Sequence, residues 1–132
     1  DNITITQALA SFPGIPGRLQ RHKLKNGTQA FVDFAHSPGA VEQVLKTLRP
    51  LTPHLIVVFG CGGDRDKTKR PVMGSIVEMY ADLIIITDDN PRTEPREKIA
   101  ENILQGITKK DLVIIELDRS KAIEYAVAHA TN

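Results

Sequence analysis

The sequence predicts an α/β fold in which a mainly parallel sheet has helices on both of its faces. Three short, continuous apolar runs, rich in β-branched residues, are typical of strands buried on both sides. They span residues 55–59, 83–87 and 112–115, and each starts about one βα unit after the previous one. Stretches with helical periodicity fill the intervals, and this alternation of strands and helices defines the class.

The beginning of the chain is expected to be less regular. Residues 3–12 predict a short helix, and the proline- and glycine-rich residues 12–17 predict a connector. Residues 18–24 could form an extra strand, and the asparagine–glycine pair at 26–27 is typical of a hairpin turn. A weaker strand is expected at 29–33, and we predict that it is the first strand of the parallel sheet.

Four amphipathic helices are expected after that strand, because apolar residues recur there at positions i, i+3, i+4 and i+7. Ser37 is a suitable N-cap for the first of them, and Pro38 suits its first turn. Right-handed crossovers would place these helices on both faces of a Rossmann-like sheet. The apolar stripes lie within residues 41–48, 72–80, 99–107 and 122–130.

Composition excludes several classes of function. The chain has 132 residues, which fits one ordinary domain, and its net charge of +1 argues against a general nucleic-acid binder. No apolar run approaches the roughly 20 residues of a membrane-spanning helix, and residues 1–12 do not have the pattern of a signal peptide. Cys61 is the single cysteine, which fits a reducing compartment and predicts a cytoplasmic protein.

Polar residues and glycines gather where the predicted strands end. In open α/β sheets, ligands bind outside the carboxyl ends of the strands, so these segments are the expected working edge. The segments are residues 33–38, 60–70, 88–94 and 116–119.

The 60–70 segment combines glycines with a dense run of charges. Its backbone N–H groups could cradle an anion, and its glycines would allow close approach. It is not a P-loop, because Asp66 stands where that motif requires glycine. A glycine-rich turn with a solvated charge run is the alternative. Cys61 is interpreted as a small loop residue, since no second cysteine or His–Cys spacing indicates a metal site.

Two other segments offer binding groups. Residues 88–92 read DDNPR, a set that could hold a zwitterion, with the guanidinium on a carboxylate and the acidic and amide groups on an ammonium. An Asx-type turn that caps the next helix is an equal alternative. Asp33 could bind ribose hydroxyls, as an acidic residue after a first strand often does. A lone histidine such as His36 is more often structural.

Four motifs together resemble the Mur ligases in their order and spacing. They are GIPGR at 14–18, VDFAHSP at 32–38, FGCGGDRDKTKRP at 59–71 and TDDNPR at 87–92. The resemblance covers nearly the whole chain from about Ile3, and it implies the C-terminal domain of such a ligase. Two positions depart from the family pattern: Phe34 stands in place of a tyrosine, and Gly39 in place of an acidic or amide residue.

The resemblance implies an ATP-dependent acid–amino-acid ligase of peptidoglycan biosynthesis, which serves the cell wall, cell shape and cell division. ATP would phosphorylate the D-glutamyl carboxylate of UDP-MurNAc-L-Ala-D-Glu, and the amine of meso-diaminopimelate would attack the acyl phosphate. Mg²⁺ would be bound mainly by domains outside this sequence. The alternatives are a ligase of the same type that adds L-lysine or another amino acid, and a stand-alone flavodoxin-like binding module.

The resemblance also implies roles for individual residues. Arg18 would contact ATP phosphate, Asp33 the ribose and His36 the nucleotide nearby. Arg65 and Arg92 would hold a carboxylate of meso-diaminopimelate, while Asp89 and Asn90 complete the distal end of that amino acid. No catalytic residue or metal ligand is implied within this part of the enzyme.

The implied domain organisation has two parts. Residues 1–17 would be the tail of the central ATPase domain and a hinge connector, and residues 18–132 the C-terminal domain without its last strand. The enzyme is expected to be a monomer in the cytoplasm, with no membrane span and no nucleic-acid partner. The isolated chain is expected to be inactive, and amide formation by this chain with ATP, magnesium and the nucleotide precursor would contradict that.

Overall fold

A parallel sheet of three strands forms the centre of the domain in the computed structural model, which describes residues 2–131. The strands are β3 (Ile56–Phe59), β4 (Leu83–Ile86) and β5 (Val113–Ile115), in that spatial order. Ile56 is paired with Leu83, and Ile84 with Val113, so all three strands begin at the same edge. The predicted α/β class and its three apolar strands are confirmed.

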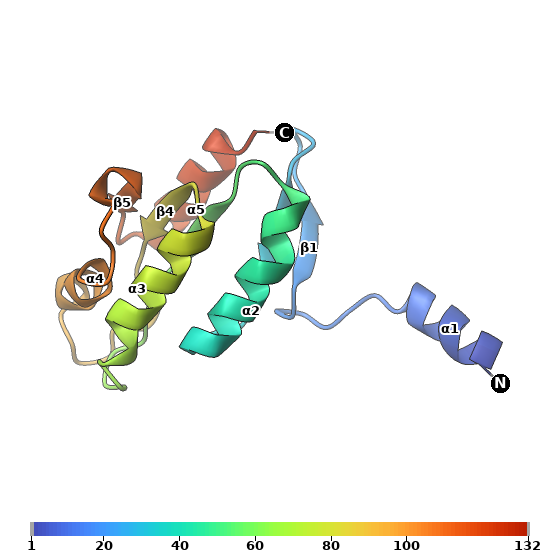
Figure 1. Cartoon of the computed structure of the whole chain (residues 1–132), viewed down its shortest axis with the longest axis horizontal. Helices are drawn as coiled ribbons and strands as arrows, with labels where there is room; N and C mark the ends of the chain where they lie inside the picture. Colours follow the sequence, from blue (N-terminus) through green and yellow to red (C-terminus); the bar gives the residue numbers. More distant parts are fainter. Residues whose placement is uncertain (1, 132) are drawn as a thin grey trace.

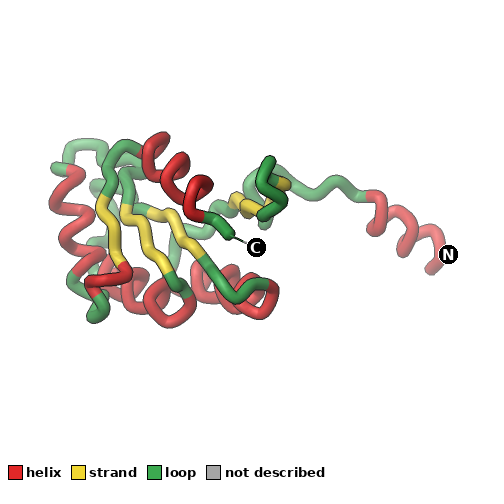
Figure 2. Tube along the Cα trace, turned by 90° about the horizontal axis from the view of Figure 1, so that it is seen from above, coloured by secondary structure: helices red, strands yellow, loops and turns green. Residues whose placement is uncertain are grey.

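Helices cover both faces of this sheet (Figure 2). Helix α3 (Lys69–Tyr80) packs between α2 (Pro38–Leu48) and α4 (Arg96–Leu104), and α5 (Arg119–His129) lies against β3 and β4 on the opposite face. Short 3₁₀ turns at Arg49–Leu51 and Lys110–Leu112 precede β3 and β5. The four predicted helices are therefore present.

Strand β4 supplies the centre of the core. Successive side chains of a strand point to opposite faces, and Ile84, Ile85 and Ile86 are all fully buried. Ile84 and Ile86 belong to the cluster formed with α2, α3 and α4, and Ile85 lies outside that cluster. The main core cluster comprises Val41, Leu45, Cys61, Met73, Ile76, Val77, Ala81, Ile84, Ile86, Ile99, Ala100, Ile103 and Ile107.

The strand predicted at 29–33 is real, but it does not belong to the parallel sheet. It is β2 (Gln29–Val32), which pairs antiparallel with β1 (Gln20–Lys23) in a separate two-stranded sheet. The two strands form the predicted hairpin, with Gln20 opposite Val32. The prediction of a fourth parallel strand is wrong because the backbone of this segment pairs with β1, which the turn at residues 26–27 brings alongside it, and not with β3.

The predicted N-terminal helix is α1 (Asn2–Ser11), which projects away from the rest of the domain (Figure 1). Its apolar side chains Ile5 and Leu9 are exposed. Among the described residues, no helix has the length and apolar character that crossing a bilayer requires.

Candidate functional site

The loops that follow the parallel strands meet at the carboxyl edge of the sheet. The Gly63 N–H donates to the Asn90 carbonyl at 2.8 Å, which joins the loop after β3 to the loop after β4. Arg119, the first residue of α5, donates to the Asp88 carbonyl at 3.0 Å and so connects the C-terminal helix to the same edge. The predicted working edge is thus a single continuous surface.

Arg65 and Arg92 converge over Gly62, although they come from different loops. A Cβ atom on Gly62 would lie 2.8 Å from Arg92 Nη1 and 3.8 Å from Arg65 Cγ. Arg92 donates to the Gly63 carbonyl at 2.7 Å, a neutral partner that leaves its charge uncompensated. Neither guanidinium makes an ion pair within the part of the chain that the structure describes. Two exposed cations without acidic partners can attract an anionic group.

The side chains of Asp88, Asp89 and Asn90 stand free beside these arginines. Within residues 2–131, none of the three makes a side-chain hydrogen bond or ion pair. The alternative of an Asx turn that caps α4 is therefore not what the structure shows, since the N-cap position of α4 is Pro95 without a side-chain cap. Acceptor oxygens and guanidinium groups are left available together, as binding of a zwitterion requires.

Arg18, Asp33 and His36 gather around the exposed ring of Phe34. The Arg18 guanidinium carbon lies 5.7 Å from the centre of that ring, and the His36 ring meets it edge-on with centroids 5.5 Å apart. His36 Nδ1 lies 3.0 Å from the Phe34 carbonyl oxygen. The structure therefore brings the three candidate nucleotide residues into one cluster, here called the Phe34 cluster (residues 18 and 33–36).

Asp33 has a structural task in this cluster. Its two carboxylate oxygens accept the N–H groups of Leu19 and Ala35, each at 2.8 Å. These bonds tie the entrance of β1 to the exit of β2, and Leu19 has a left-handed backbone with φ 43°. A role in binding ribose would have to use the remaining lone pairs of a carboxylate that is already engaged.

Lys69 connects the Phe34 cluster to the parallel sheet. Its Nζ donates to the His36 carbonyl at 2.8 Å, across 33 positions of the chain. Lys69 is the first residue of α3. The start of this helix therefore contacts the Phe34 cluster as well as the loops of the parallel sheet.

Sequence reasoning missed the residues that hold the sheet-side loops together. Arg70, the second residue of α3, is fully buried and donates to Glu94, to Asn102 and to the Gly62 carbonyl. Hydrogen bonds from the Arg70 guanidinium lower the pKa of Glu94 to about 2, and the same hydrogen bonds, accepted by the Glu94 carboxylate, raise the pKa of Arg70. A signal was present, because residues 70, 73, 74 and 77 form one buried helical stripe.

Cys61 and the acidic residues do not form a reactive or metal centre. Cys61 is buried, its Sγ lies 3.8 Å from Met73 Sδ, and burial raises the pKa of its thiol, so it is a core residue. Over residues 2–131, no group of three or more His, Cys, Asp or Glu side chains could hold a metal ion.

Comparison with known proteins decides the family. The family described as Mur ligase, glutamate ligase domain, matches residues 17–132. The chain belongs to the Mur ligase family. Its curated relatives include the UDP-N-acetylmuramoyl-L-alanyl-D-glutamate–2,6-diaminopimelate ligases of Aquifex aeolicus, 54% identical over 86% of this chain, and of Thermosynechococcus vestitus, 46% identical over 93%. This Mur ligase domain spans about a quarter of those relatives, 23% and 25% of their lengths.

Solved structures agree with this family assignment. A structure of a UDP-N-acetylmuramoyl-L-alanyl-D-glutamate–2,6-diaminopimelate ligase covers 99% of this chain and 27% of that chain, with a TM-score of 0.81 and 38% identity. A folylpolyglutamate synthase from Thermotoga maritima covers 94% of the domain and 28% of that chain, with a TM-score of 0.71 and 21% identity. The second likeness shows the shared fold alone.

Proposed function

We propose that this chain is the amino-acid-binding, C-terminal domain of an ATP-dependent ligase that adds meso-diaminopimelate to UDP-MurNAc-L-Ala-D-Glu in the cytoplasm. Residues 18–132 would form this domain, and residues 1–17 would be the tail of the preceding ATPase domain with its hinge. The names of the related ligases support this assignment. The observation that carries it is the convergence of Arg65 and Arg92 over Gly62.

The positive charges of Arg65 and Arg92 match a negative group of the proposed substrate. meso-Diaminopimelate ends in a second amino-acid head, with a carboxylate that lysine lacks. Arg65 and Arg92 would bind this carboxylate, and the free oxygens of Asp89 and Asn90 would accept hydrogen bonds from its ammonium. A lysine in the same place would leave the guanidinium groups unpaired, a penalty of a few kcal/mol that disfavours it.

The reaction would form one amide bond through an acyl phosphate. The D-glutamyl carboxylate takes the γ-phosphoryl group of ATP, the amine of diaminopimelate attacks the activated carbonyl, and ADP and phosphate leave. This domain would hold the distal head so that the reacting amine is oriented toward the acyl phosphate. Arg18, Asp33 and His36 would contact the nucleotide. Mg²⁺ would be bound mainly by domains outside this sequence.

Alanine substitution of Arg92 tests the proposal in the full-length ligase. We expect R92A to raise the KM for meso-diaminopimelate at least tenfold, because one good charge-assisted contact contributes about 1.5–3 kcal/mol. The KM for ATP should stay within about twofold. Steady-state kinetics with each substrate varied in turn gives both values.

Arg96→Ala is the matched control. Arg96 is also exposed and lies four residues further along, but its one ion pair is with its neighbour Glu97. R96A should leave the kinetics of both substrates unchanged. Unaltered diaminopimelate kinetics in R92A would remove the basis of the assignment, and efficient use of L-lysine by the unmodified enzyme would favour the lysine-adding alternative.

A further inference from the structure

Arg70 is a buried charge whose described side-chain hydrogen bonds go to the loops of the proposed amino-acid site and to the helix beside them. Its side chain is 0% exposed, and a buried cation is stable only when it is paired and hydrogen-bonded. Nη1 donates to Glu94 Oε2 and to Asn102 Oδ1, each at 3.0 Å. Nη2 donates to Glu94 Oε1 at 2.9 Å and to the Gly62 carbonyl at 3.2 Å. The guanidinium therefore binds the loop after β3, the loop after β4 and helix α4 together.

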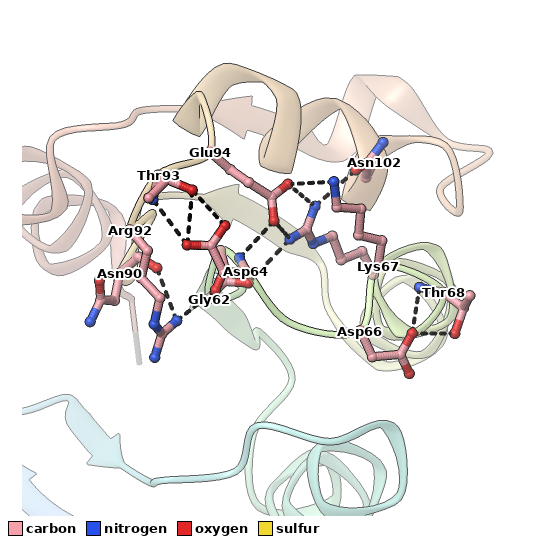
Figure 3. Close-up of polar contacts among 12 residues, drawn as sticks. Gly62, Asp64, Asp66, Lys67, Thr68, Asn90, Arg92, Thr93, Glu94 and Asn102 are labelled. Atoms are coloured by element: carbon pink, nitrogen blue, oxygen red, sulfur yellow. Dashed lines mark hydrogen bonds and ion pairs between the residues drawn. The ribbon is translucent and has the colours of Figure 1, made fainter.

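Glu94 is the acidic centre of this network (Figure 3). Only 10% of its side chain is exposed. Besides the bidentate contact with Arg70, its Oε1 accepts the Asp64 N–H at 2.7 Å. Its Oε2 lies 3.2 Å from Lys67 Nζ. One carboxylate on the β4 loop thus fixes the backbone of the β3 loop next to Arg65.

The loops held by this pair have unfavourable backbone conformations. Asp64 and Arg92 both have left-handed φ values, 52° and 51°, without being glycine. Such conformations persist only where surrounding contacts impose them. Asp64 accepts the Thr93 hydroxyl at 2.8 Å and the Thr93 N–H at 3.2 Å, which places the two strained residues in contacting segments. The side chains that would bind substrate therefore depend on contacts behind them.

We propose that Arg70 and Glu94 are positioning residues that fix Arg65 and Arg92 at the separation needed to bind the distal head of diaminopimelate, an inference that rests on the proposed function. Neither residue would touch the substrate: Arg70 has no exposed surface, and both Glu94 oxygens are already bound. Arg65 and Arg92 would bind the substrate, and their placement would depend on a pair of side chains that does not touch it.

Arg70→Lys in the full-length ligase tests the proposal. Lysine keeps the positive charge but cannot make the forked contacts to Glu94, Asn102 and Gly62 at once. We expect R70K to raise the KM for meso-diaminopimelate at least tenfold, with kcat changed by less than threefold and the KM for ATP by less than twofold. A purely structural defect would instead lower the active fraction, and hence kcat, without moving either KM.

Arg49→Lys is the matched control at the opposite edge of the sheet. Arg49 also makes a fork, to the Tyr80 carbonyl and Asp82 with one nitrogen and to the Thr52 and Pro53 carbonyls with the other. R49K should therefore reproduce the loss of a structural arginine without any change in the KM for diaminopimelate. An equal rise of that KM in R49K and R70K would overturn the proposal.

A double-mutant cycle shows whether Arg70 acts through Arg92. If it does, R70K in an R92A background should raise the KM by much less than it does alone. Fully additive effects would overturn the positioning role. If R70K does not fold, Glu94→Gln replaces it in the same double-mutant cycle. This variant keeps an acceptor for the Asp64 N–H but weakens the contact with Arg70. An effect of R92A without an effect of R70K would refute this inference alone, whereas no effect of R92A would refute the proposed function.

Discussion

Gly62 and Gly63 are neighbours in sequence, but they meet very different surroundings. A Cβ on Gly62 would meet the end of the flexible Arg92 side chain at 2.8 Å. A Cβ on Gly63 would lie 1.8 Å from the Pro91 carbonyl oxygen and 2.6 Å from its carbon, which belong to the backbone. A side chain can move away at the first position, whereas the backbone at the second cannot.

Alanine at these two glycines should therefore separate binding from stability. G63A should lower the free energy of unfolding by about 1–3 kcal/mol, because overpacking displaces backbone. G62A should change stability by less than about 0.5 kcal/mol, as do substitutions whose neighbours can adjust, and still raise the KM for diaminopimelate by moving Arg92. Urea-induced unfolding and ligase kinetics measure the two effects. A G62A variant that is as unstable as G63A would show that Arg92 is held more rigidly than we infer.

Only the residues that belong to the motifs could be predicted as site residues from the sequence. The pairing of Arg65 with Arg92 was implied by the resemblance to the Mur ligases, and in the structure both side chains lie beside Gly62. The supporting pair was not predicted, because Glu94 lies outside any periodic segment and Arg70 was considered only as part of the charged loop at residues 60–70. The helical phase of Arg70 with Met73 and Val77 was the overlooked signal, since a charge on a buried stripe needs a partner.

At the scale of elements, two helix starts differ in how they are capped. The Asp118 side chain accepts the N–H groups of Ser120 and Lys121 at the start of α5. Ser37 occupies the predicted N-cap of α2 with extended backbone, but its side chain makes no capping hydrogen bond. The start of α2 depends instead on Pro38, whose fixed φ suits the first helical position.

Replacement of these two caps by alanine should reveal that difference. D118A should destabilise the domain by about 1 kcal/mol, because two N–H groups lose their acceptor. S37A should have an effect within about 0.5 kcal/mol, since no hydrogen bond is lost. Thermal or urea unfolding followed by circular dichroism measures both, and equal losses would contradict the assigned capping roles.

Continuous apolar runs predicted the parallel strands well, and the match is best for the central strand β4, whose isoleucines are fully buried. The strand at 29–33 was assigned to the wrong sheet because its partner is decided by the hairpin turn before it, which brings β1 alongside. Helix ends were also less certain. The predicted apolar stripe of the third helix extends to Ile107, but α4 ends at Leu104. Ile107 is buried, although it lies in the segment after the helix. Local composition thus indicated burial more reliably than pairing.

At the scale of the whole molecule, the pairing of Glu94 makes acid a specific destabilising agent. Hydrogen bonds from Arg70 hold the pKa of Glu94 at about 2, below its ordinary value of 4.5. The unfolded chain therefore binds this proton more readily than the folded one. The stabilisation is fully present above pH 4.5 and is lost as the pH falls through about 2.

Acid titration should show this contribution directly. The melting temperature of the unmodified domain should fall between pH 4.5 and pH 2, and E94Q should lose less over the same interval because it has no carboxyl group to protonate at that position. Differential scanning calorimetry across that range measures the effect. Parallel pH profiles for the two proteins would show that Glu94 contributes nothing to acid sensitivity.

Lys69 and Arg70 are consecutive residues at the start of α3, and they serve different halves of the working edge. Lys69 reaches the carbonyl of His36, while Arg70 reaches Glu94 and Asn102. If the proposed function holds, the amino-acid preference could not be transferred to another enzyme by exchanging residues 89–92 alone. The smallest segment set to transfer would be residues 62–70 and 88–94 together with Asn102, with Lys69 kept to contact the His36 carbonyl.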